Sequence, residues 1–91
     1  MYKVIYSREA EDCFTQIHEY ISHDSIFQTT KVIHHIKTTI EILKLFPLSG
    51  NSLGGDLRMI VDTKYRYKIF YTFSRNTVTI VSVSKYKNTW E

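Results

Sequence analysis

The sequence predicts an α+β fold in which an N-terminal strand and an α-helical hairpin pack on a mainly antiparallel four-stranded sheet. Three observations predict this class. Apolar residues recur at helical spacing in the first half of the chain, β-rich runs replace them after Asp56, and a short β-branched segment comes first. With 91 residues, one Pro and three Gly, the chain is expected to form a single globular domain over residues 1–91.

The first predicted elements are a strand and a helix. The segment YKVIYS at 2–7 is short and rich in aromatic and β-branched residues, which is typical of a strand. Ser7 is a good N-cap residue, and the acidic residues that follow it suit the positive end of a helix dipole. Apolar positions from Ala10 to Ile21 then recur at helical spacing. We therefore expect the first helix to begin directly after Ser7.

A second helix is predicted from about Ser25 to Leu45, where apolar residues again recur every three or four positions. The connection at 22–25 is short, so the two helices should form an antiparallel hairpin. Pro47 is expected to end the second helix. The following PLSGNSLGG is predicted to be a loop, but not a phosphate-binding one, because it follows a helix and lacks the Lys-Ser/Thr ending.

Three strands are predicted after Asp56, at 57–61, 66–73 and 77–84, with a hairpin turn at Ser74-Arg75-Asn76. Consecutive strands with short connections should form an antiparallel meander, to which the N-terminal strand adds. The two helices should lie across one face of this sheet, because neither can bury its apolar stripe on the other alone. The second face is expected to be partly open and to carry positive charge, together with the C-terminal tail.

Positive charge is concentrated in the C-terminal third. Residues 1–57 hold five Lys or Arg against seven acidic residues, whereas residues 58–91 hold seven against two. The segment LRMIVDTKYRYKIFYTF alternates cations with aromatic residues. This distribution suits an anionic partner, such as nucleic acid or an acidic protein segment.

Composition also excludes several classes. Cys13 is the only cysteine, so an intrachain disulfide is impossible, and its thiol is best interpreted as a small apolar residue on a helix face. The N-terminus has no apolar run of signal-peptide length, and no segment approaches the roughly 18 apolar residues of a membrane span. We therefore expect a cytoplasmic protein with no membrane association.

The order of these pieces resembles the RelE/ParE superfamily of type II toxin–antitoxin toxins over nearly the whole chain. The resemblance rests on five pieces in sequence order: the opening strand with its acidic helix, LKLFPLSG at 43–50, the pair Leu57-Arg58, YKIFY at 67–71 and VTIVSVSKYKNTW at 78–90. It implies a compact toxin neutralised by an antitoxin that wraps an extended, partly helical segment around it, in a hetero-oligomer. No metal or organic cofactor is implied.

Members of this superfamily divide by target. RelE-like toxins enter the ribosomal A site and cut mRNA, whereas ParE-like toxins inhibit DNA gyrase without a known hydrolytic site. RNA cleavage needs a base, an acid and positive charge at the scissile phosphate. The four His residues all lie in the predicted helical region, and Ser84 stands where several nucleases of the family carry a C-terminal His. The ParE-like interpretation is therefore preferred, with the RelE-like mRNA endonuclease as the alternative.

The candidate site residues differ between these two interpretations. A nuclease would have to use four candidates: Arg58, Lys68, Lys85 and Tyr86. A gyrase inhibitor would use a contact surface for gyrase or antitoxin that consists of Arg58, Arg66, Lys68, Lys85, Lys87 and Trp90. Each candidate also has a structural interpretation, in which Arg58 binds loop carbonyls and Lys68 is a solvated strand residue. A third interpretation is an inactive relative that keeps the fold as an interaction module.

The adjacent pair His34-His35 is not expected to bind a metal ion, because neighbouring side chains on a helix point about 100° apart. We expect one or both to be surface residues or residues of the helical hairpin.

Overall fold

The computed structural model describes residues 2–22 and 26–85. Its order is β1 (Lys3–Tyr6), α1 (Arg8–Ser22), α2 (Ile26–Leu45), β2 (Asn51–Gly54), β3 (Leu57–Asp62), β4 (Tyr67–Ser74) and β5 (Thr77–Lys85). The strands form one sheet in the order β1-β5-β4-β3-β2. β1 pairs parallel with β5, and every other pair is antiparallel. The predicted α+β class is confirmed, but the sheet has five strands, not four.

The additional strand is β2, which lies within the segment predicted to be a loop. Its four residues pair with β3, with an irregular register between Ser52 and Gly54. All four are exposed, so no apolar alternation marks this strand in the sequence. The prediction that PLSGNSLGG is a loop was wrong in its second half, because backbone pairing with a neighbouring strand needs no apolar side chains.

Ser7 joins α1 to the sheet. Its hydroxyl accepts a hydrogen bond from the Ala10 amide at 3.0 Å, which confirms the predicted N-cap. The same hydroxyl donates to the Val81 carbonyl at 2.9 Å. Val81 is the extra residue where the register between β4 and β5 shifts, since Phe70 pairs with Ser82 and Tyr71 with Ile80. The bulge thus provides a carbonyl that fixes the start of α1.

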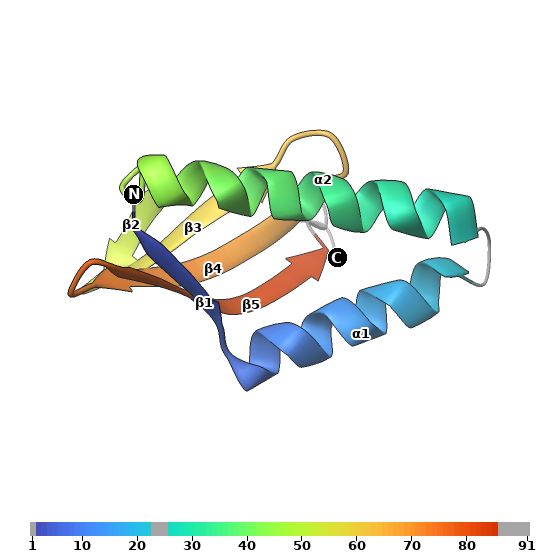
Figure 1. The fold of residues 1–91 in the computed structure, drawn as a ribbon, viewed down its shortest axis with the longest axis horizontal. Coiled ribbons are helices and arrows are strands. Elements are labelled where there is room, and N and C mark those ends of the chain that lie inside the picture. Colours follow the sequence, from blue (N-terminus) through green and yellow to red (C-terminus); the bar gives the residue numbers. More distant parts are fainter. Residues whose placement is uncertain (1, 23–25, 86–91) are drawn as a thin grey trace.

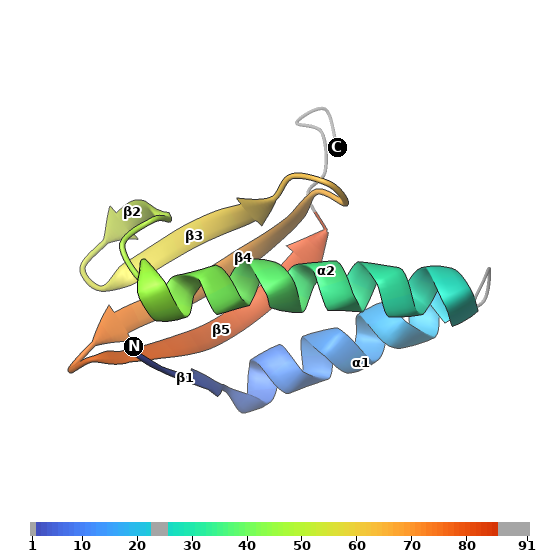
Figure 2. The ribbon, with the colours of Figure 1, turned by 45° about the horizontal axis from the view of Figure 1, so that its top comes forward.

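One core lies between the helices and the sheet. The buried apolar residues come from α1 (Ala10, Ile17), α2 (Val32, Ile36, Ile40, Leu43), β4 (Tyr67, Ile69, Tyr71) and β5 (Val78, Ile80, Val83). Burial alternates along β4, so one sheet face contacts the helices and the other is partly open. α2 runs across the sheet, and α1 lies beside α2 and β5 (Figures 1 and 2).

The hairpin turn between β4 and β5 consists of Arg75 and Asn76. Ser74 pairs directly with Thr77, so the connection has two residues. Both have positive φ, at 53° and 61°, as a type I′ turn requires. This confirms the predicted turn. The predicted turn between the helices falls partly on residues 23–25, which lie outside the described residues.

Candidate functional site

Arg58 and Tyr71, from adjacent strands, hold the loop that joins α2 to β2. They are direct neighbours in the β3–β4 register. The Arg58 guanidinium donates to the Gly50 carbonyl at 2.7 Å and to the Leu48 carbonyl at 3.3 Å. The Tyr71 hydroxyl donates to the Pro47 carbonyl at 2.8 Å and accepts from the Gly50 amide at 2.9 Å. The structural role considered for Arg58 is therefore the one that its contacts show.

The fit around Gly50 is close. A Cβ atom at this position would lie 2.6 Å from the Tyr71 hydroxyl oxygen and 2.8 Å from the Met59 carbonyl oxygen. Burial raises the pKa of the Tyr71 phenol, although the Gly50 amide and the nearby Arg58 charge act in the opposite direction. The phenol is therefore held neutral and serves as a hydrogen-bond donor and acceptor for the loop.

Lys68 lies on the opposite face of the sheet from Arg58. Its neighbours along β4, Tyr67 and Ile69, are both buried in the core, so the Lys68 side chain must leave the strand on the open face. It is half-buried there, opposite Val61 in the register. Two residues proposed for one phosphate site thus stand on different faces of the sheet.

The remaining predicted site residues lie in the connection between β3 and β4 and at or beyond the end of the described chain. Lys85 is the last residue of β5, and its backbone pairs with Tyr67. Arg66 is exposed in the connection between β3 and β4, with a positive φ of 66°. The predicted candidates Tyr86, Lys87 and Trp90 lie outside the described residues. Lys64, Arg66 and Arg75 lie in turns rather than on strands, and the predicted cations of the tail lie outside the described residues.

A contact between His35 and the buried Asp62, which the sequence did not indicate, connects α2 to the end of β3. Nδ1 of His35 contacts Oδ1 of Asp62, whose side chain is fully buried. Oδ2 of Asp62 accepts a hydrogen bond from the Tyr65 amide at 2.9 Å. The Tyr65 and His35 rings meet edge to face, with centroids 5.6 Å apart. Helical spacing offered one signal, since His35 lies three residues after the buried Val32.

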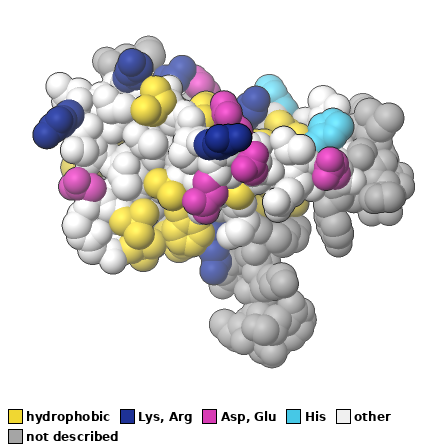
Figure 3. All heavy atoms as spheres, turned by 90° about the horizontal axis from the view of Figure 1, so that it is seen from below, with side chains coloured by type: hydrophobic (Ala, Val, Ile, Leu, Met, Phe, Trp, Pro, Cys, Tyr) yellow, Lys and Arg dark blue, Asp and Glu magenta, His cyan; other side chains and the backbone are white. Residues whose placement is uncertain are grey.

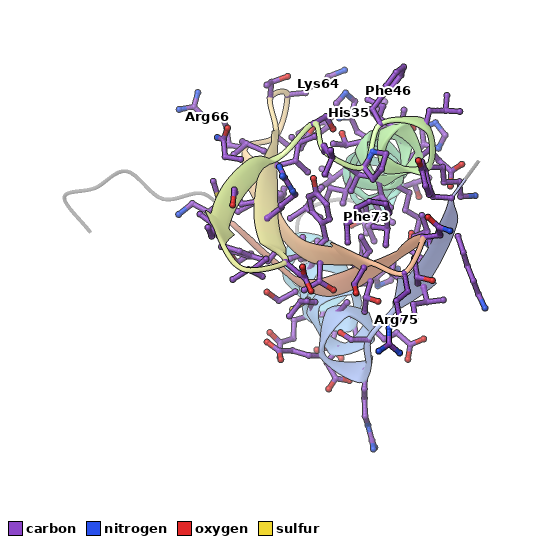
Figure 4. All side chains as sticks on the ribbon, turned by 90° about the vertical axis from the view of Figure 1, so that its left-hand side faces the viewer. His35, Phe46, Lys64, Arg66, Phe73 and Arg75 are labelled. Atoms are coloured by element: carbon purple, nitrogen blue, oxygen red, sulfur yellow. The ribbon has the colours of Figure 1, made fainter. Side chains whose placement is uncertain are left out.

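The connection between β3 and β4, residues 63–66, forms a basic turn beside the contact between His35 and Asp62. Lys64 and Arg66 are both exposed, and Lys31 is exposed one helical turn before His35 on α2. Asp62, the residue that precedes this turn, is buried. In Figure 4, Lys64 and Arg66 lie on the same side of the molecule, away from Arg75.

Acidic side chains gather elsewhere, over α1. Four of them are exposed on this helix: Glu9, Glu11, Asp12 and Glu19. Figure 3, which views the molecule from the side of α1, shows acidic side chains close together on this surface. The described structure therefore separates an acidic helix from the basic turn.

An apolar groove lies at the end of the molecule where α2 finishes. It has a volume of about 490 Å³ and is lined by Tyr2, Leu45, Phe46, Pro47, Leu48, Ser49 and Phe73. Phe46 and Leu48 are 63% and 61% exposed, which is unusual for large apolar side chains. Figure 4 shows Phe46 pointing outward and Phe73 pointing toward α2. Such a concentration of exposed apolar side chains is typical of an interaction surface.

Other kinds of site receive no support from the described residues. Within 2–22 and 26–85, no three His, Cys, Asp or Glu side chains are placed so that they could hold a metal ion. Cys13 is half-buried against the core. None of the helices described is long and apolar enough to span a membrane.

Comparisons with known proteins identify the family. The model of the ParE toxin of the type II toxin–antitoxin system parDE matches residues 4–90. A solved structure of the chromosomal ParDE TA system from P. aeruginosa has the same fold, with a TM-score of 0.82 and 13% identity over 96% of this chain and 98% of that chain. No curated protein gave a significant match. Because the family model spans nearly the whole sequence, the chain belongs to the ParE toxin family of type II toxin–antitoxin systems.

Proposed function

We propose that this toxin is a ParE-like growth inhibitor that acts on DNA gyrase and is neutralised by a cognate antitoxin. The observation that carries the proposal is the separation of Arg58 from Lys68. Arg58 is bound to loop carbonyls on the helix side of the sheet, whereas Lys68 leaves β4 on the open face. A ribonuclease would need such groups around one phosphate.

Neither His35 nor His18 is placed to supply the missing acid or base. Nδ1 of His35 is engaged by the buried Asp62. His18 lines a shallow hollow between the helices, with Glu19 and Lys37 but no other His. These placements support a toxin that acts by binding rather than by cleaving RNA.

The proposed contact surface for gyrase or antitoxin keeps all the predicted residues: Arg58, which also holds the loop, Arg66, Lys68 and Lys85, together with Lys87 and Trp90 of the tail. The apolar groove adds a protein-binding surface, because its exposed large side chains provide the apolar contact area that the cations lack. The proposal requires no metal ion and no organic cofactor.

The target can be tested by a short pulse of expression from a tightly repressed promoter. Protein synthesis and induction of the DNA-damage response are followed over the same minutes, and purified gyrase is assayed for accumulated DNA cleavage. We expect damage signalling and cleavage complexes while translation continues. Early arrest of translation with mRNA cut within codons would establish the RelE-like nuclease instead. No response in either assay would favour the inactive interaction module.

A variant tests the contact residues. Arg58→Ala combined with Lys85→Ala should reduce growth inhibition, and Lys3→Ala combined with Arg8→Ala is a control that removes one Lys and one Arg elsewhere. Toxin levels must be equal in both strains, because Arg58 also holds the loop at 47–50. Full growth inhibition by the first variant would count against these contacts.

A further inference from the structure

The basic turn has a charge pattern that favours phosphate groups. Lys64 and Arg66 extend from residues 63–66, and Lys31 adds a third exposed cation from α2. The acidic residue closest in sequence, Asp62, is fully buried and paired with His35, so it presents no carboxylate to an approaching ligand. The acidic side chains of α1 gather on another surface (Figure 3).

The surroundings of these cations differ from those of a protein-binding surface. Protein interfaces usually have an apolar centre with aromatic residues, whereas phosphate contacts need only cations and hydrogen-bond donors. The large apolar side chains that are exposed in the described structure are Tyr2, Ile5, Ile42, Leu45, Phe46, Leu48 and Leu53. None of them belongs to residues 57–74, which include the basic turn. This surface therefore suits a phosphate backbone, in addition to the protein contact proposed for Arg66.

The placement of Tyr65 in the basic turn favours duplex over single-stranded nucleic acid. Single-stranded nucleic acid is usually bound by stacking of its bases on exposed aromatic rings. Tyr65, the aromatic residue of the basic turn, is half-buried and packs against the edge of the His35 ring. It thus offers no open platform for a base. Duplex DNA presents phosphates without requiring stacking, and it is the nucleic acid on which the proposed target acts.

We propose that Lys31, Lys64 and Arg66 bind the phosphate backbone of duplex DNA. This inference rests on the proposed function for the choice of duplex DNA over RNA. The His35–Asp62 contact has a positioning role, since it ties α2, which carries Lys31 one helical turn before His35, to the strand end that precedes the turn. The contact is independent of DNA sequence, because contacts to phosphate groups carry no sequence information directly.

The test measures binding of the purified toxin to a fluorescent 20-base-pair duplex over a range of salt concentrations. When the logarithm of the binding constant is plotted against the logarithm of the salt concentration, each phosphate contact contributes about −0.9 to the slope. Three cations should therefore give a slope of about −3. Each contact therefore makes binding roughly eightfold tighter at 0.1 M salt than at 1 M salt. A slope near zero for the unmodified toxin would overturn the proposal.

Matched variants distinguish an effect of the basic turn on DNA affinity from an effect of net charge. The variant Lys64→Gln/Arg66→Gln should bind the duplex at least about tenfold more weakly, with the slope reduced by nearly 2. The control Lys3→Gln/Arg75→Gln removes the same charge at the other end of the molecule, so it should retain most of the affinity. It is matched in backbone strain as well, because Arg75, like Arg66, has positive φ. Equal losses in both variants would overturn the proposal. Thermal unfolding of both variants checks that they fold, and Lys64→Gln alone replaces the double variant if Arg66→Gln destabilises the chain.

The two proposals can fail separately. If gyrase is inhibited but the toxin shows no salt-dependent DNA binding, the phosphate site is wrong and the proposed function stands. If the basic turn binds duplex DNA but gyrase is unaffected, the site is supported and the target is wrong. Tighter binding to single-stranded RNA of the same length than to the duplex would overturn the choice of duplex DNA.

Discussion

Replacement of Tyr71 by Phe should strongly destabilise the fold. The hydroxyl serves two buried backbone groups, the Pro47 carbonyl at 2.8 Å and the Gly50 amide at 2.9 Å. The Tyr71 side chain is fully buried, so neither group gains water when the hydroxyl is removed. A buried polar group left without a partner costs about 1–3 kcal/mol, so the change should lower the free energy of unfolding by about 2–5 kcal/mol.

This loss is large for a chain of this size. Domains of this length have free energies of unfolding of roughly 5–14 kcal/mol, and 1 kcal/mol shifts the midpoint by about 4–8 °C. Urea and thermal unfolding of Tyr71→Phe should therefore show a clear shift. Tyr2→Phe is the matched control, because its side chain is 36% exposed and loss of a surface hydroxyl should change stability by less than about 0.5 kcal/mol.

Gly50 offers an independent test of the same contact. Gly50→Ala places a Cβ atom against both the Tyr71 hydroxyl and the Met59 carbonyl, and such overpacking should cost about 1–3 kcal/mol. Combined with Tyr71→Phe, the loss should be less than the sum of the two single losses, because the clash with the hydroxyl disappears. The reasoning would be refuted if Tyr71→Phe cost less than about 1 kcal/mol, or if the two changes were fully additive.

Three further outcomes are expected. Arg58→Ala should lower the free energy of unfolding by about 1–2 kcal/mol, because two loop carbonyls lose a charged donor. Urea unfolding measures this loss, and no change would mean that the guanidinium does not hold the loop. His35→Ala should cost about 2–4 kcal/mol, because Oδ1 of the buried Asp62 carboxylate loses its contact with His35 and keeps only the Tyr65 amide at Oδ2; an unchanged midpoint would contradict this. Because the pKa of Tyr71 is raised in the folded state, its contribution to stability is complete below about pH 10, the pKa of an ordinary phenol, and is lost at higher pH. Unfolding from pH 9 to 11 should thus show a steeper loss in the unmodified chain than in Tyr71→Phe.

Local patterns were sufficient for most of the fold. The Ser7 cap, the apolar spacing of both helices and the Arg75-Asn76 turn are interactions between residues close in sequence, so their signals are visible there. β2 was missed because its side chains are all exposed and its pairing uses only backbone groups. A strand of this kind leaves no alternating pattern.

Side-chain partners across the fold were less predictable. The sequence placed Arg58 and Lys68 in one candidate site, but strand register directs their side chains to opposite faces of the sheet. His35 was expected on the surface or in the hairpin, and it proves to be the partner of Asp62, which lies 27 positions later in the sequence. Contacts of this range depend on how α2 lies across the sheet.

The amino-acid sequence by itself determined the α+β class, the helical hairpin, the meander and the likeness to a family of toxins. These follow from periodicity, capping and the order of segments along the chain. Tertiary structure alone decided which cations share a surface, because packing sets the register of β3 and β4 and the position of α2 over them. It thereby assigned Arg58 to the loop and left Lys64 and Arg66 exposed in the basic turn beside a buried carboxylate.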